Sequence, residues 1–240
     1  MAAVGAVEEA SAYWFVVPAA GIGSRFGADK PKQYALIDEY CVIEHSITRL
    51  LQWRPSSQVV VAVAERDRWW SQLSISQDPR VNTVIGGGER AQSVFNALEF
   101  IQDRAGSNVW VLVHDAARPC VDSASLTRLE HRVQEEGSGG LLAIPVADTL
   151  KKASLQNTVR QTVDRSALWA AQTPQMFRFQ PLFSALQQAL MTGRIVTDEA
   201  SALEYQGVEP VLVEGDCRNI KITRPEDIDL ARFYIASERL

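Results

Sequence analysis

Short apolar runs alternate with amphipathic runs along most of this 240-residue chain, and this alternation restricts the folds available to it. The apolar runs are rich in valine and have the length of buried strands, whereas the runs between them have helical periodicity. Strands that alternate with helices form a mostly parallel sheet with helices on both faces. The predicted strands are residues 13–18, 59–64, 109–113 and 141–146, and the predicted helices are residues 42–53, 90–102 and 123–135.

The second half of the chain is expected to continue in the same way. The predicted elements are helices at residues 181–192 and 198–206 and strands at residues 211–213 and 219–223. A last helix is predicted to start at Thr223, with Pro225 early in its first turn and Glu226 three residues after the capping hydroxyl.

Residues 149–165 interrupt the alternation, because this segment is polar and has Gln156 and Asn157 at its middle. Residues 149–153 and 158–163 can pair as a hairpin across that turn. An isolated hairpin is only marginally stable in water. We therefore expect an arm that packs on a second subunit, and a plain surface loop is the alternative.

The composition excludes several classes of function. The formal net charge is −5, whereas a protein that binds the backbone of nucleic acid needs a basic face. The apolar runs are shorter than the roughly 20 residues that cross a bilayer, and Cys41, Cys120 and Cys217 form no disulfide or zinc pattern. We expect a cytoplasmic protein with one domain over residues 13–240, preceded by a loose extension of residues 1–12.

A loop of small residues, AAGIGSRFG at positions 19–27, follows the first predicted strand. Small side chains let backbone N–H groups approach phosphate, and this end of a strand is where α/β folds bind ligands. Phe26 stands where a dinucleotide-binding loop has Gly or Ala, and no Gly-Lys-Ser/Thr follows as in a P-loop. Instead, Arg25 and Lys32 supply cations that suit a triphosphate. A structural glycine turn with solvated lysines is the alternative.

The predicted strand at residues 109–113 ends in the motif HDAARP. Asp115 is expected to project into the same crevice as the small-residue loop. Mg²⁺ takes one or two carboxylates and completes its shell with water and phosphate oxygens, so Asp115 is a candidate ligand for Mg²⁺ or another divalent cation. Ala116 leaves room for a ligand, and Arg118 is expected to hold the loop by a salt bridge. A capping or loop carboxylate is the alternative for Asp115.

Seven motifs follow one another in order: PAAGIGSRFGADKPKQY, IGGGERAQSV, HDAARP, VADTLKK, VDRSALWAAQTPQMF, VTDEASALE and NIKITRPEDIDLA. As a set they resemble the 2-C-methyl-D-erythritol 4-phosphate cytidylyltransferases of the non-mevalonate isoprenoid pathway, over nearly all of residues 13–236. The resemblance implies a Rossmann-like sheet of the nucleotide-diphospho-sugar transferase type, with a protruding β-arm for dimerisation. It also implies transfer of CMP from CTP to the substrate phosphate, with release of pyrophosphate.

The resemblance implies a role for each matching residue. The CTP phosphates and ribose would lie at Ala19, Ala20, Gly21 and Gly23, the cytosine at Gly87 and Ser93, and the nucleotide also beside Asp115 and Ala116. Arg25 and Lys32 would stabilise the transition state, and the metal would bind Asp115, with Asp216 as the candidate second ligand. Methylerythritol phosphate would bind Thr149, Arg165, Thr173 and Lys221. Because Arg165 lies in the arm, a homodimer partner would complete the site. Gly88 departs from the pattern, since an acidic residue is common there.

These residue types suit the implied chemistry. The attacking group is a phosphate with a second pKa of about 6, so it is largely dianionic at neutral pH and needs no general base. The main obstacle is repulsion between two polyanions. Mg²⁺, Arg25 and Lys32 would offset it on one side of the reacting phosphorus, and Arg165 and Lys221 on the other, so that catalysis is positioning plus electrostatics.

Three other functions compete with this interpretation. A cytidylyltransferase for another polyol phosphate, such as ribitol 5-phosphate, would share the fold and the chemistry. A glycosyltransferase would need an Asp-x-Asp metal motif at a strand end, and Asp227-Ile228-Asp229 instead falls in a predicted amphipathic helix. A nucleotide-binding module without catalysis would not need cations on both sides of the phosphate.

Overall fold

The computed structural model describes residues 13–21, 26, 30–106 and 108–237 of the chain. A seven-stranded sheet in the order β11-β7-β10-β6-β1-β4-β5 forms its centre. Its strands are β1 (Tyr13–Pro18), β4 (Gln58–Val63), β5 (Val81–Ile85), β6 (Trp110–Val113), β7 (Gly140–Pro145), β10 (Trp169–Arg178) and β11 (Val211–Glu214). All neighbours are parallel except the pairs that β10 forms with β6 and β7. The predicted mostly parallel sheet is therefore confirmed.

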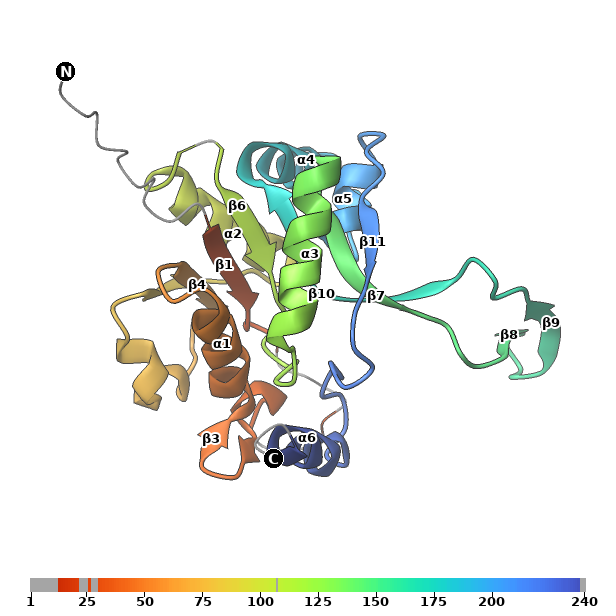
Figure 1. Cartoon of the computed structure of the whole chain (residues 1–240), viewed down its shortest axis with the longest axis horizontal. Coiled ribbons are helices and arrows are strands. Elements are labelled where there is room, and N and C mark those ends of the chain that lie inside the picture. The colour runs from red at the N-terminus through yellow and green to blue at the C-terminus, as the bar shows by residue number, and fades with distance from the viewer. Residues whose placement is uncertain (1–12, 22–25, 27–29, 107, 238–240) are drawn as a thin grey trace, which may run out of the picture.

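The inner strands are apolar on both sides because helices cover both faces of the sheet. Helices α1 (Val42–Trp53) and α3 (Ser123–Glu136) lie together on the near face in Figure 1 and share one apolar core with alternate residues of β1. Helices α2 (Arg90–Gln102), α4 (Phe179–Met191) and α5 (Glu199–Glu204) bury a second core with the other residues of β1. These helices match the predicted ones to within a few residues.

Local signals explain where α3 begins and ends. The carboxylate of Asp122 accepts hydrogen bonds from the backbone N–H of Ser125 at 2.8 Å and from its hydroxyl at 2.6 Å, which satisfies a free donor of the first turn. Gly137 ends the helix with a φ of 75°, a conformation that glycine adopts at low cost.

A third apolar cluster lies beneath the carboxyl ends of the strands. It joins α6 (Asp227–Ser237) to the small hairpin of β2 (Leu36–Ile37) and β3 (Tyr40–Cys41) and includes Ile222. Short 3₁₀ turns connect other elements: η1 (Lys32–Tyr34), η2 (Trp70–Gln72) and η3 (Ser74–Gln77). Through this cluster, the C-terminal part of the chain closes one side of the ligand-binding edge.

Two expectations about elements need correction. Residues 219–223 form an irregular segment and not a strand, because its buried groups are held by single hydrogen bonds such as that from the N–H of Ile222 to the carbonyl of Ala117, at 2.8 Å. Helix α6 begins at Asp227, whose carboxylate, in place of that of Glu226, accepts the hydrogen bond from the backbone N–H of Thr223, at 2.7 Å. Strands β2, β3, β5 and β10 were not predicted.

The polar segment of residues 149–165 forms a hairpin that projects from the body of the molecule (Figure 1). Strands β8 (Leu150–Ala153) and β9 (Val159–Val163) pair antiparallel across a turn in which Asn157 has a φ of 58°. The predicted pairing is therefore confirmed. The side chain of Leu155 at its tip is 95% exposed.

Within the described ranges, no helix is long and apolar enough to cross a membrane.

Candidate active site

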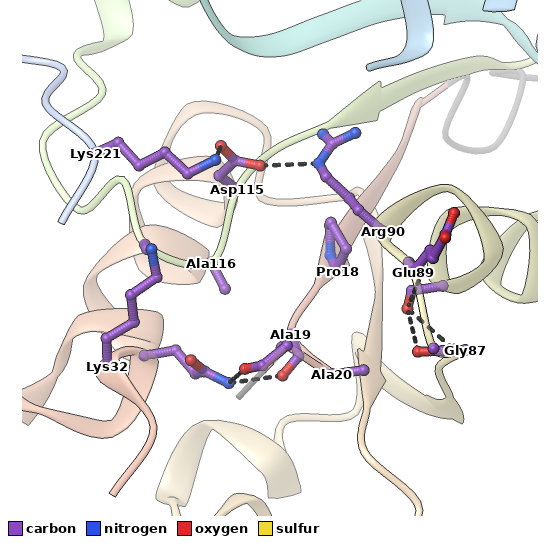
Figure 2. Close-up of a pocket in the computed structure, with 15 residues that line it drawn as sticks. Pro18, Ala19, Ala20, Lys32, Gly87, Glu89, Arg90, Asp115, Ala116 and Lys221 are labelled. Carbon is purple, nitrogen blue, oxygen red and sulfur yellow. Dashed lines mark hydrogen bonds and ion pairs between the residues drawn. The ribbon is translucent and has the colours of Figure 1, made fainter. Parts of the chain in front are cut away.

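A pocket of about 250 Å³ opens at the carboxyl ends of the parallel strands β1, β5 and β6 (Figure 2). Residues directly after each of these strands line it, which is the position that α/β sheets use for ligands. Nine residues predicted to act in the site line this pocket: Ala19, Ala20, Gly21, Lys32, Gly87, Ser93, Asp115, Ala116 and Lys221. Gly23 and Arg25 lie outside the described residues.

Gln33 connects the small-residue loop to the turn that carries Lys32. Its buried side-chain amide donates hydrogen bonds to the carbonyl oxygens of Ala19 at 2.7 Å and Gly21 at 3.1 Å. The Lys32 ammonium donates to the carbonyl of Ile222 at 2.7 Å. Gln33 was not predicted from the sequence, because its role depends on a turn of the chain that brings residues 19–21 against η1.

The loop after β5 forms another wall and is shaped by glycines. The Ser93 hydroxyl accepts a hydrogen bond from the N–H of Gly87 at 3.0 Å and lies 3.1 Å from the carbonyl of Glu89. A Cβ at Gly86 would lie 2.6 Å from the Cβ of Ala20, and one at Gly87 would lie 2.1 Å from Cγ of Gln92. A Cβ at Gly88 would meet nothing within 4 Å. The departure at Gly88 is therefore compatible with the backbone of this loop.

Asp115 lies at the centre of a cluster of cations. Its Oδ1 is 3.2 Å from Nε of Arg90, and its Oδ2 is 2.8 Å from Nζ of Lys221 and 3.6 Å from Nε of Arg118. Burial acts to raise the pKa of Asp115, but the charges of Arg90 and Lys221 more than offset it and hold that pKa well below its usual range. Figure 2 shows the carboxylate between Arg90 and Lys221, across the pocket from Ala19 and Ala20. Asp115 is thus a preformed anion within a cationic wall.

Arg90 was not singled out from the sequence, although it stands in the motif IGGGERAQSV. Its Nη1 and Nη2 lie 2.5 and 3.0 Å from the two carboxylate oxygens of Glu199, which is 1% exposed. Burial acts to lower the pKa of Arg90, but Glu199 and Asp115 together raise it above its usual range. The guanidinium therefore stays charged and joins the start of α2 to the start of α5.

A second pocket, of about 290 Å³, adjoins the first. Both are lined by Arg90, Asp115 and Lys221, and the second also includes Thr173 and Arg118. The two pockets are thus neighbouring compartments with Asp115 between them. This arrangement suits a reaction between two ligands that meet at one charged wall.

Thr173 holds the backbone of Asp115 in place. Its hydroxyl oxygen accepts a hydrogen bond from the N–H of Asp115 at 3.0 Å and lies 3.0 Å from Nδ1 of His114. Burial lowers the pKa of His114 to about 4, so the imidazole is neutral at pH 7. Since its Nε2 faces the carbonyl of Arg118 at 3.0 Å, Nε2 carries the proton and Nδ1 accepts from Thr173.

Arg118 supports the loops around the site, as predicted. Besides its ion pair with Asp115, it donates to the carbonyl of Asn219 at 2.6 Å and, from Nη2, to that of Ala171 at 3.4 Å. Arg118 thereby ties the irregular segment at residues 219–223 to β10 and to the end of β6.

The comparison with known proteins identifies the family. The model of the 2-C-methyl-D-erythritol 4-phosphate cytidylyltransferase family matches residues 13–237. The chain belongs to this cytidylyltransferase family. A protein of that name from Vibrio vulnificus strain YJ016 is 51% identical over 224 residues, which are 93% of this chain and 94% of that protein. One from Mannheimia succiniciproducens is 50% identical over 221 residues, 92% of this chain and 95% of its own length.

Solved structures of the cytidylyltransferase family share this fold. The crystal structure of the Francisella tularensis 2-C-methyl-D-erythritol 4-phosphate cytidylyltransferase has a TM-score of 0.82 at 34% identity, covering 92% of this chain and 99% of that one. A crystal structure of a 4-diphosphocytidyl-2C-methyl-D-erythritol synthase has a TM-score of 0.80 at 38% identity, covering 93% and 97% of the two chains. The predicted family and the mostly parallel α/β fold are both confirmed, whereas the use of the arm for dimerisation stays a prediction.

Two residues with predicted roles in this cytidylyltransferase site lie away from both pockets. Thr149 and Arg165 are exposed at the two ends of the hairpin, and neither lines either compartment. Nothing in a single chain brings either residue to Asp115, so their roles stay predictions.

Asp216, the candidate second metal ligand, is engaged elsewhere. Its two carboxylate oxygens accept hydrogen bonds from the guanidinium of Arg218, at 2.6 and 3.0 Å, and Oδ1 also accepts from the backbone N–H of Arg218 at 2.7 Å. It lines neither pocket. In this chain Asp216 fixes its own loop by a local ion pair, and its role as second metal ligand stays a prediction.

The residues present fit a divalent cation that arrives with a triphosphate. Asp115 offers one ionised carboxylate at the pocket wall, and Mg²⁺ binds through one or two carboxylates with phosphate and water oxygens. In the described ranges, no group of three or more His, Cys, Asp or Glu side chains comes together to hold a metal. Of the predicted ligands, Asp115 is the one that the fold places in the pocket.

Proposed function

We propose that the protein transfers CMP from CTP to 2-C-methyl-D-erythritol 4-phosphate, giving 4-diphosphocytidyl-2-C-methyl-D-erythritol and pyrophosphate, as a step of isoprenoid precursor biosynthesis. The match of residues 13–237 to the family carries this proposal. Two adjoining compartments that share Arg90, Asp115 and Lys221 support it, because this reaction joins two anionic ligands.

In the proposed reaction, a phosphate oxygen of methylerythritol phosphate attacks the α-phosphorus of CTP. The bond from that phosphorus to the bridging oxygen of the β-phosphate breaks, and pyrophosphate leaves with the electron pair. The attacking oxygen carries no proton that must be removed, since a phosphate monoester with a second pKa of about 6 is largely dianionic at neutral pH. A neutral, fully buried His114 agrees with a site that needs no general base.

Each of the two compartments would bind one of the two substrates. The 250 Å³ pocket would take CTP, with its phosphates along Ala19–Gly21 and Lys32 and its base at the loop of Gly87. The 290 Å³ pocket would take methylerythritol phosphate, with its phosphate at Lys221. Lys32 and Lys221 come from distant segments, yet the Lys32 ammonium bonds to the carbonyl of the residue after Lys221. Both lysines line the first pocket, which supports a role for them in offsetting the charge that builds up during transfer.

The proposed reaction also requires a divalent cation, Mg²⁺. Bound at Asp115, it would neutralise charge on the triphosphate. Asp115 is suited to this because its neighbours keep it ionised and its backbone is held by Thr173.

We also propose that the protein is a homodimer in which residues 149–165 of one subunit reach the partner's site. The exposed strands of this hairpin, with Val159 and Leu155 open to solvent, support an arm that another surface covers. Arg165, at the end of the arm, would then bind the substrate phosphate in the second compartment of the partner.

The glycosyltransferase alternative lacks its metal motif at the pocket. The carboxylate of Asp227 accepts hydrogen bonds from Thr223 and Arg224, and Asp229 pairs with Arg232 at 2.5 Å. Both acidic residues therefore serve α6 and its surroundings.

Pyrophosphate release tests the proposed function directly. The purified protein would be incubated with CTP and Mg²⁺ together with methylerythritol phosphate, ribitol 5-phosphate or no acceptor, and the nucleotide product identified by mass. We expect release that depends on methylerythritol phosphate and a product that carries CMP. Faster release with ribitol 5-phosphate would assign another polyol phosphate, and binding of CTP without release would indicate a module without catalysis.

A further inference from the structure

All three nitrogens of the Arg90 guanidinium are engaged, but unequally. The Nη edge forms a two-fold pair with Glu199 at 2.5 and 3.0 Å, whereas only Nε reaches Asp115, at 3.2 Å. A two-fold arginine–carboxylate pair is directional and stronger than a single contact. Arg90 therefore belongs mainly to Glu199, although it lies beside the pocket anion Asp115.

Glu199 is held rigidly behind the pocket wall. It is the first residue of α5, directly after Asp198, whose carboxylate caps the helix by accepting from the N–H of Ser201 at 3.0 Å. Gln175 on β10 donates to Asp198 at 2.8 Å and accepts from the N–H of Ala200 at 2.8 Å. Asp198 and Ala200, on either side of Glu199, are therefore tied to the central sheet.

This arrangement decides how much of Asp115 is open to a cation. Arg90, Arg118 and Lys221 all lie within 3.6 Å of its carboxylate. An arginine released from Glu199 would turn its Nη edge towards Asp115, which its Nε already contacts, because a buried charge without a partner is costly. Such an arginine would compete with a divalent cation for the same oxygens.

We propose that Glu199 is a positioning residue that withholds Arg90 from Asp115 and so keeps the Asp115 carboxylate available to the divalent cation that accompanies the nucleotide. This inference rests on the proposed function, in which Asp115 binds that cation. It assigns a role to Glu199, 84 residues away from Asp115 in sequence, that acts through Arg90 and not through contact with substrate.

The test measures binding of Mn²⁺ in the presence of CTP, by calorimetry or paramagnetic resonance, so that it does not depend on turnover. Glu199→Gln keeps the shape of the side chain but removes the charge that holds Arg90. We expect it to weaken Mn²⁺ binding by about tenfold or more, as is typical for residues that orient metal ligands. Arg90→Met/Glu199→Gln also removes the released arginine, and we expect its Mn²⁺ affinity to return to within about threefold of wild type.

Glu130→Gln is the matched control, because Glu130 is also a buried carboxylate that pairs with an arginine, Arg54, but lines neither pocket. We expect it to lower the melting temperature without changing Mn²⁺ affinity. If Glu199→Gln behaves like Glu130→Gln, the role of Glu199 is structural and the inference is overturned. The same conclusion follows if the double variant binds Mn²⁺ as weakly as Glu199→Gln does.

Two further outcomes separate this inference from the proposed function. If Glu199→Gln does not fold, the double variant Arg90→Met/Glu199→Gln is measured in its place, because it leaves no buried charge without its partner. A tenfold loss of Mn²⁺ affinity in the double variant would overturn the inference. Asp115→Asn identifies the metal ligand. If it binds Mn²⁺ as wild type does, both the inference and the proposed role of Asp115 are wrong. If Asp115→Asn loses Mn²⁺ binding but Glu199→Gln keeps it, only the inference is wrong, and the proposed function is unaffected.

Discussion

The ammonium of Lys221 lies 2.8 Å from Oδ2 of Asp115. The lysine expected to bind the substrate phosphate is therefore paired with the carboxylate expected to bind the cation. A cation that takes Oδ2 would leave Lys221 free to meet an incoming phosphate. The exposure of Lys221 allows this movement, since 40% of its side chain is accessible to solvent.

Lys32→Ala should lower kcat by about 10²-fold or more while KM for CTP changes far less, because a contact made mainly in the transition state acts on kcat. Steady-state kinetics with CTP as the varied substrate measures both constants. Arg132→Ala is the control, since it removes a positive charge from the exposed side of α3. A Lys32→Ala protein with near-normal kcat would show that Lys32 serves only to hold Ile222.

Asp115→Asn should abolish activity, because Mg²⁺ requires a charged oxygen ligand. Since Asp115 is buried among three cations, its neutralisation should also lower the free energy of unfolding by roughly 3 kcal/mol. Urea denaturation measures the second effect, and activity is assayed at a temperature where the variant remains folded. Activity that keeps its normal dependence on Mg²⁺ would exclude Asp115 as the metal ligand.

Subunits with Arg165→Ala and subunits with Lys32→Ala should complement each other if the arm acts in the partner's site. Random mixing makes half of the dimers heterodimers, and each of these has one intact site of two, so activity should rise towards about a quarter of wild type. Each variant mixed with itself is the control. No recovery, with subunit exchange demonstrated by mass spectrometry, would place Arg165 in its own subunit's site or in none.

Gly86→Ala should raise KM for CTP and lower the free energy of unfolding by about 1–3 kcal/mol, because the new Cβ would force Ala20 and Ser93 apart. Gly106→Ala is its control, because a Cβ there meets nothing within 4 Å and Gly106 lines neither pocket, and it should leave both quantities nearly unchanged. Kinetics and thermal melting compare the two variants. Equal effects would mean that backbone freedom, and not space, is the reason for these glycines.

The sequence alone was sufficient wherever a residue's structure depends on its neighbours along the chain. The apolar run of β1, the periodic faces of α1 and α2 and the paired strands of the arm were all predictable, because burial on both faces, helical spacing and turn chemistry are local patterns. The placement of Ala19 and Asp115 at strand ends also allowed both to be assigned to one crevice.

Tertiary structure alone decided the features that join distant segments. Strand β10 has polar residues and Pro174 in its interior and no clear alternation, and it becomes a strand because β6 and β7 leave a place between them. Arg90 and Glu199 are 109 residues apart in the sequence. The local sequence around each indicates only a charged residue at the start of a helix. Only the packing of α2 and α5 on the same face of the sheet brings them together beside Asp115, because an ion pair depends on distance in space, which local sequence patterns do not encode.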